Sequence, residues 1–175
     1  MHPEPLAFRR ATADDAAALS HFARRMFDEV FGPQNSADDM AAYMAVAFSP
    51  DAQRRELTQR SRTCFVGENA EGAIGAYLLL RVGTNQPCAT GPDPVEIERF
   101  YVDFPWHGKG AAQGMMALAM DTARAMGGQT LWLGVWEHNP RAIAFYSKCG
   151  LIDIGEHEFV LGADVQTDRI MARAL

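Results

Sequence analysis

The stretch "ERFYVDFPWHGKGAAQGMM", residues 98–116, changes from one sequence pattern to another. It opens in an apolar run typical of a strand and closes in an alanine- and methionine-rich run typical of a helix, with Gly108, Gly110 and Gly114 around the junction. The first backbone N–H groups of such a helix have no partner inside it, and the helix dipole adds partial positive charge there. Because glycine lets an anion approach the backbone, the pattern predicts a phosphate or pyrophosphate site, with Lys109 adding charge at its rim.

The glycines alone leave other interpretations open. Nothing in the chain matches the Walker A loop of nucleoside-triphosphate-binding proteins. The dinucleotide fingerprint G-x-G-x-x-G is nearly present, but Gly114 comes one residue too late, so an NAD-binding protein is a rival hypothesis. A structural turn that binds nothing also fits the glycines taken by themselves.

The segments on either side of this junction predict one α/β domain over residues 1–175. Strand and helix patterns follow in the order β, two helices, ββ, β, α, β, α, ββ, which favours a mixed sheet. The expected strands cover 6–12, 63–68, 72–82, 95–102, 130–136, 151–161 and 167–174. The expected helices cover 16–30, 36–47, 110–126 and 139–150, with a further short helix within the polar segment 49–61.

The strand "VEIERFYV" (95–102), which precedes the glycine turn, carries two acidic residues. Strict alternation divides its side chains between two faces. One face is expected to hold Glu96, Glu98, Phe100 and Val102, and the other Val95, Ile97, Arg99 and Tyr101.

Composition excludes several classes of protein. The net charge is −6 and no basic stripe is visible, which argues against a nucleic-acid partner and allows attraction of cationic small molecules. No apolar run of membrane-spanning length and no signal peptide are present, so we expect a cytoplasmic protein without a membrane partner. The three cysteines, Cys64, Cys88 and Cys149, fit a reducing compartment, and the histidines and cysteines show no metal-ligand spacing.

Two motifs resemble one known family. The segment "FYVDFPWHGKGAAQGMM" resembles the acyl-coenzyme A loop of the GNAT superfamily of N-acetyltransferases, Q/R-x-x-G-x-G/A after a strand, with His107 where glutamine or arginine is usual. The segment "NPRAIAFYSKCGLIDIG" (139–155) resembles the family's N-x-x-A-x-x-x-Y-x-x-x-G-F helix and strand. The resemblance covers nearly the whole chain. It implies a mostly antiparallel central sheet of about six to seven strands, flanked by about four helices.

The same resemblance implies acetyl-coenzyme A (acetyl-CoA) as the acetyl donor. The pyrophosphate would bind backbone amides near the helix start, and the pantetheine arm would pair with free backbone groups of a strand that is splayed from its neighbour, which a bulge near residues 99–101 could assist. The candidate donor-binding residues are Phe100, Tyr101, Val102, His107, Gly108, Lys109, Gly110, Ala111, Ala112, Asn139 and Tyr146.

Acetyl transfer by direct attack through a tetrahedral intermediate needs three kinds of group. The backbone N–H near Val102 is the candidate donor to the oxyanion. Tyr146, which the resemblance places near the sulfur, would protonate the leaving thiolate, although a purely packing role is the alternative. Glu96 or Glu98 could take the amine proton; either could instead be salt-bridged, to Arg99 or Arg141, and solvent could take the proton.

The acceptor is less well defined by the sequence. The segment 26–48 resembles the bacterial spermidine/spermine N-acetyltransferase branch, which implies Phe27, Phe31, Asn35 and Tyr43 as substrate-binding residues. Nearby acidic residues would suit a polyamine or another small amine. A protein or peptide amine, or a non-catalytic sensor of acyl-coenzyme A, are the alternatives. Dimers are frequent among similar proteins, so a homodimer is possible.

Overall fold

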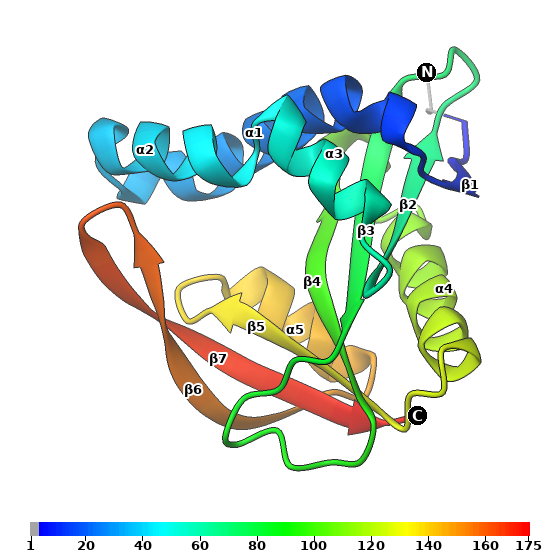
Figure 1. The fold of residues 1–175 in the computed structure, drawn as a ribbon, viewed down its shortest axis with the longest axis vertical. Helices are drawn as coiled ribbons and strands as arrows, with labels where there is room; N and C mark the ends of the chain where they lie inside the picture. The colour runs from blue at the N-terminus through cyan, green and yellow to red at the C-terminus, as the bar shows by residue number, and fades with distance from the viewer. Residues whose placement is uncertain (1–3) are drawn as a thin grey trace.

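The computed structural model describes residues 4–175, which form a seven-stranded mixed sheet (Figure 1). The strand order is β1-β2-β3-β4-β5-β7-β6, and β4 pairs with β5 in parallel while the other pairings are antiparallel. The strands are β1 (Ala7–Arg10), β2 (Arg62–Glu68), β3 (Ile74–Val82), β4 (Pro94–Val102), β5 (Thr130–Trp136), β6 (Ile152–Leu161) and β7 (Asp164–Ala174). The expected α/β class with a mostly antiparallel sheet is confirmed.

Within the described part of the chain, five α-helices cover the two faces of the sheet. They are α1 (Ala16–Phe31), α2 (Ala37–Ala47), α3 (Pro50–Thr58), α4 (Ala111–Ala125) and α5 (Pro140–Lys148). The first three lie across one side of the sheet and α4 and α5 across the other (Figure 1). The polar segment at 49–61 does form a helix, because Ser49 caps its first turn by accepting a hydrogen bond from the Ala52 N–H at 3.1 Å.

Each face of the sheet has its own hydrophobic core. Beneath α4 and α5 lies a cluster that includes Leu78, Ile97, Met115, Leu133 and Met171, each at most 4% exposed. Beneath α1 and α2 lies a second cluster, which includes Leu19, Phe22, Met40, Tyr77 and Leu79. Burial of apolar surface on both faces, worth about 25 cal/mol per Å², holds the helices on the sheet.

The sheet is split between β4 and β5. Their parallel pairing covers only residues 94–96 against 130–132, although both strands continue beyond that point. The two strands start side by side and then separate toward their C-terminal ends (Figure 1). This confirms the expected separation, and it leaves the facing edges of residues 97–102 and 133–136 without a ladder between them.

A bulge in β4 corrects the expected assignment of its faces. The register against β3 shifts between Leu80↔Ile97 and Leu79↔Arg99, so Glu98 is the extra residue. Beyond it the alternation is displaced by one position. Phe100 and Val102 therefore pack with Val95 and Ile97 in the α4 and α5 core, whereas Tyr101 joins the α1 and α2 core. The expected pairing of Glu96 with Phe100 on one face was wrong, and the bulge lies one residue before the segment expected for it.

Within the described residues 4–175, none of the helices has the length and hydropathy needed to cross a bilayer.

Candidate active site

A cavity of about 650 Å³ passes through the split in the sheet, with walls from both faces. We call its two parts the α5 side and the α1 side. On the α5 side it is lined by Phe100, Val102, Gly108, Ala142, Phe145 and Tyr146. On the α1 side it is lined by Phe27, Tyr43, Glu96, Trp132, His157 and Asp168. Because one cavity reaches both faces, two molecules entering from opposite sides can meet within the split.

The glycine turn provides an open helix N-terminus at the α5 side. Gly108 and Gly110 have φ values of 72° and 86°, a left-handed conformation that favours glycine. A Cβ built on either residue would meet no atom within 4 Å, so the backbone there is not covered by other parts of the protein. Gly110 occupies the N-cap position of α4, and Ala111 is its first residue. The Lys109 ammonium folds back and donates to the Pro105 carbonyl at 2.7 Å.

The backbone of Val102 faces the split. The Asp103 N–H donates to the Gly75 carbonyl across the Val102·Ala76 pair, at 2.9 Å. In an antiparallel ladder this pattern means that the N–H and C=O of Val102 point away from β3 and toward β5. By the same alternation, Phe100 also presents its backbone groups to the split, whereas Tyr101 bonds to β3.

His107 forms a hydrogen bond with one of these backbone groups, the carbonyl of Val102. Its Nε2 lies 2.6 Å from the Val102 carbonyl oxygen. Burial lowers the pKa of His107, which favours the neutral ring, and an Nε2–H then donates to that carbonyl. His107 therefore braces the end of β4 against the glycine turn, and the N–H of Val102 is the group left facing the cavity.

Tyr146 comes from α5 and reaches the cavity from the α5 side. It is 8% exposed, its ring packs edge-on against Phe100 at 5.9 Å, and the described residues give its hydroxyl no hydrogen-bond partner. Burial raises the pKa of Tyr146, so the phenol keeps its proton at neutral pH. Asn139 positions the helix, because its Oδ1 accepts the Ala142 N–H at 3.2 Å.

Glu98 is held by an arginine. Arg62 Nε and Nη2 donate to the two carboxylate oxygens of Glu98, each at 2.8 Å, and Arg81 lies 4.0 Å away. Burial, the largest single influence, would raise the pKa of Glu98, but the hydrogen bonds from Arg62 together with the positive charges of Arg99, Arg62 and Arg81 outweigh it and hold the pKa below its usual value. The partner is neither Arg99, which pairs with Glu56, nor Arg141. A carboxylate fixed in this way is a weak base.

We expect Arg62→Ala to lower the free energy of unfolding by about 3 kcal/mol, because it leaves Glu98 charged and buried, without its two hydrogen bonds and with Arg81 4.0 Å away. Side-chain exposure is only 12% for Arg62 and 18% for Glu98. Urea unfolding at pH 7 measures the loss. Since the pKa of Glu98 is lowered on folding, the contribution is present above its unfolded pKa and disappears as the pH falls through the folded pKa. A loss that persists unchanged in acid would contradict this account.

Glu96 is the carboxylate in β4 without a basic partner within salt-bridge distance among the described residues. Its Oε2 accepts a hydrogen bond from Thr84 Oγ1 at 2.6 Å. Burial raises the pKa of Glu96, while the Thr84 hydroxyl lowers it less. A buried carboxylate with a raised pKa is a better proton acceptor than Glu98, and Glu96 lines the cavity.

The expected acceptor residues are only partly brought together. Phe27, Phe31 and Tyr43 line the α1 side, with ring centroids of Phe27 and Tyr43 at 4.9 Å. Asn35 lies outside the cavity wall; its Nδ2 donates to the Phe31 carbonyl at 2.7 Å and its Oδ1 accepts from Gln166. Asn35 thus ties the α1–α2 connection to β7.

Asp168 is a further charged residue of the cavity and is not among the expected site residues. It lies on β7, where it pairs with Trp136 of β5 on one side and His157 of β6 on the other. All three side chains line the α1 side of the cavity. The registers of β7 against β5 and against β6 bring the three residues together, and no local motif in the sequence marks this.

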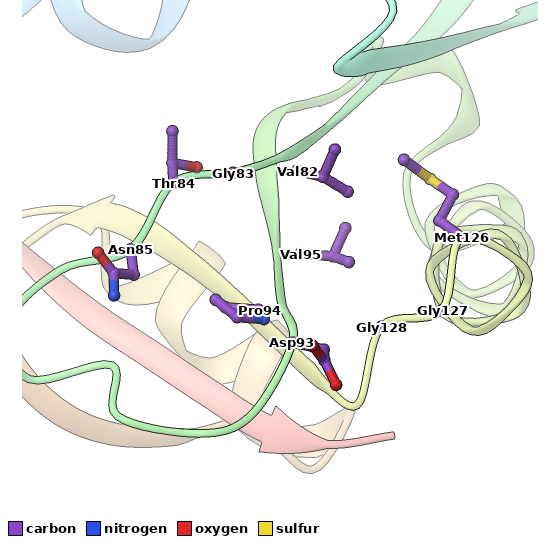
Figure 2. Close-up of a pocket in the computed structure, with 10 residues that line it drawn as sticks. All are labelled: Val82, Gly83, Thr84, Asn85, Asp93, Pro94, Val95, Met126, Gly127 and Gly128. Atoms are coloured by element: carbon purple, nitrogen blue, oxygen red, sulfur yellow. The ribbon is translucent and has the colours of Figure 1, made fainter.

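A second hollow lies at the other end of α4, between the β3–β4 connection and the helix terminus (Figure 2). Val82, Val95 and Met126 point toward one another there. Its carboxylate, Asp93, accepts a hydrogen bond from Gln129 at 2.6 Å. Across residues 4–175 no group of three or more His, Cys, Asp or Glu is arranged to hold a metal ion.

Comparisons with known proteins place the chain in a family. Residues 25–151 match the model of the acetyltransferase (GNAT) family. An uncharacterised N-acetyltransferase of Lactobacillus delbrueckii subsp. lactis is 35% identical over 87% of this chain and 87% of its own length. The protein therefore belongs to the acetyltransferase (GNAT) family, and the resemblance read from residues 98–116 and 139–155 is confirmed.

Solved structures agree with this at the level of the fold. A PaiA N-acetyltransferase from Thermoplasma acidophilum, in complex with coenzyme A, has a TM-score of 0.77 at 16% identity and covers 97% of this chain and 99% of its own. The spermidine/spermine N-acetyltransferase SpeG from Vibrio cholerae has a TM-score of 0.63 at 17% identity, with coverage of 97% and 94%. Membership of the family makes the protein an acyl-coenzyme A-dependent acyltransferase.

Proposed function

We propose that the protein transfers an acetyl group from acetyl-CoA to a primary amine of a small cationic molecule. The observation that supports this most directly is the cavity through the split sheet, with free backbone groups on its α5 side and, on its α1 side, the carboxylates of Glu96 and Asp168, which have no Lys or Arg partner among the described residues. A cationic acceptor would complement those charges. The three cysteines are free, which agrees with action in the cytoplasm.

The α5 side fits the donor. The amides at the start of α4 would hold the pyrophosphate, since the turn at Gly108 and Gly110 has no Cβ and no covering atoms. The backbone groups of Phe100 that point into the split would pair with an amide group of the pantetheine arm, as an added strand does. Acetyl-CoA supplies an acyl carbon activated as a thioester.

The residues around the split have distinct tasks in the proposed reaction. Glu96 accepts the proton of the acceptor ammonium, directly or through water, and so frees the nitrogen lone pair. The Val102 N–H donates a hydrogen bond to the carbonyl oxygen where negative charge develops. Tyr146 donates its proton to the leaving sulfur. Burial raises the pKa of Tyr146. Burial would also raise the pKa of a thiol leaving in the same place, so the thiolate there would still accept the proton.

Release of free thiol tests the proposal. The protein is mixed with acetyl-CoA and a panel of small monoamines, polyamines, amino sugars and N-terminal peptides, and a thiol reagent records coenzyme A. Turnover with small amines supports the proposal, and turnover restricted to peptides would favour a protein acceptor. Tight donor binding without thiol release in any mixture would favour a sensor of acyl-coenzyme A.

Glu96→Gln is expected to lower kcat/KM for the amine by about 10²-fold, because the amide cannot accept a proton. In the wild type the rate should fall as the pH drops through a pKa above the usual glutamate value, since burial raises the pKa of Glu96. Steady-state rates between pH 5 and about pH 9 measure both effects. The matched variant Glu98→Gln should have a lower free energy of unfolding than the wild type, while its kcat/KM should fall less than that of Glu96→Gln. Equal losses of kcat/KM in the two variants would indicate that Glu96 is not the general base.

A further inference from the structure

A notch in β5 brings a carboxylate into the α1 side of the cavity. Trp132, Gly134 and Trp136 alternate on the same face of β5, and Gly134 has no side chain between the two indoles. A Cβ at Gly134 would lie 3.2 Å from Asp168 Oδ2 and 3.2 Å from His157 Nε2. The glycine therefore makes room for these two groups, which enter the notch from β7 and β6.

Asp168 has no strong cationic partner in this position. Its side chain is 15% exposed, and the basic group facing it is His157, whose Nε2 lies 3.7 Å from Oδ2, too far for a hydrogen bond. Burial raises the pKa of Asp168 to about 6, and His157 lowers it less. Glu137 raises the pKa of Asp168 further. Arg99 acts on the neighbouring Tyr43 and lines the same cavity, but its guanidinium is paired with Glu56. A buried carboxylate in this state gains from a cation supplied by a ligand.

The walls around Asp168 suit an organic cation. They consist of an aromatic wall, which we define as Phe27, Phe31, Tyr43, Trp136 and Phe159. Its rings are in mutual contact, with centroids 5.4 Å apart for Phe31 and Trp136 and 5.3 Å apart for Tyr43 and Phe159. Aromatic faces attract ammonium groups in addition to the carboxylate.

A separate polar group in the same cavity also lacks a partner. Trp132 is 2% exposed and lines the cavity, and its Nε1 is a buried side-chain atom without a hydrogen-bond partner among the described residues. An unpaired buried donor is unfavourable by about 1–3 kcal/mol. Because the indole Nε1–H can only donate, it does not contribute to binding an ammonium group, and the cation subsite rests on Asp168 and the aromatic wall.

We propose that Asp168 and the aromatic wall bind a second cationic group of the acceptor, so that the preferred acceptor is a diamine or polyamine and not a monoamine. This rests on the proposed function. Glu96 pairs with Trp132, and the Asp168 carboxylate lies at Gly134, two residues further along β5. Two residues of strand span about 7 Å and neighbouring strands lie about 4.8 Å apart, so the two carboxylates are roughly 8–9 Å apart and one short diamine can place one nitrogen near each.

Direct binding tests the proposal without requiring turnover. Isothermal titration calorimetry measures the Kd of 1,4-diaminobutane and of butylamine for the protein saturated with coenzyme A. The wild type should bind the diamine about 10- to 100-fold more tightly than butylamine, and Asp168→Asn should remove most of that difference. The matched control Glu158→Gln, which removes the same charge from an exposed position of β6, should leave both values unchanged.

Kinetics add an independent readout. Asp168→Asn should raise the KM of the diamine while its kcat, and the KM of acetyl-CoA, stay close to wild type. The variant should fold, because it removes a buried charge, and a thermal melt checks this. No preference for the diamine in the wild type, or equal losses for diamine and monoamine in Asp168→Asn, would overturn the proposal. If the diamine binds with the expected preference but no amine releases thiol, the proposed acetyl transfer fails and the cation subsite stands.

Discussion

Gly110→Glu should abolish measurable binding of coenzyme A, a loss of at least about 10³-fold in affinity. The side chain would place a carboxylate over the open start of α4, where a Cβ meets no other atom and the amides face outward. Two negative groups would then compete for the same partial positive charge, and like charges in close contact repel by several kcal/mol. Calorimetric titration with coenzyme A measures the effect.

Backbone strain must be separated from charge in this experiment. Gly127 at the other end of α4 has φ 84°, close to the 86° of Gly110, and its Cβ would also enter open space. Gly127→Glu therefore introduces the same strain and the same charge away from the turn, and it should bind coenzyme A normally. If both variants lose binding equally, or if Gly110→Glu binds like the wild type, the turn is not the pyrophosphate site.

Tyr146→Phe should reduce kcat by about 10²- to 10³-fold while leaving the KM of acetyl-CoA and the melting temperature nearly unchanged. Phenylalanine keeps the ring that packs against Phe100 and removes only the hydroxyl, which has no partner among the described residues. The variant thus tests proton donation without opening a cavity in the core. Steady-state kinetics with a thioester whose thiol has a lower pKa should partly rescue the rate, because that leaving group needs less protonation.

A packing role for Tyr146 gives a different pattern. In that case kcat and donor affinity would fall together, the melting temperature would drop, and the better leaving group would give no rescue. That combination of results would indicate that solvent, and not Tyr146, protonates the sulfur.

Local sequence signals were sufficient for the parts of the site that lie on continuous segments. The glycines at 108 and 110 predicted an open helix start, and Asn139 with Pro140 predicted the helix that carries Tyr146; both are present. These features depend on backbone conformation and helix capping within a few residues, and both are determined by the local residue types.

Features that depend on long-range register were not predictable in the same way. The bulge at Glu98 is visible only against β3, and it reverses the face of each residue that follows. The partner of Glu98 is Arg62, 36 residues away, and not an arginine of its own neighbourhood. Asp168 and His157 meet above Gly134 only because β7 lies between β5 and β6.

Because the ladder between β4 and β5 is short, a bound donor would stabilise the sheet in addition to supplying the acetyl group. Residues 94–96 and 130–132 alone join the two halves of the sheet at the split, so a bound extended chain would act as a strut between them. Anything that binds only the native state shifts the unfolding equilibrium, by about 2.7 kcal/mol at a hundred times its Kd. The stability of the enzyme in a cell would then depend on the concentration of its own donor, decreasing when that concentration falls and increasing when it rises.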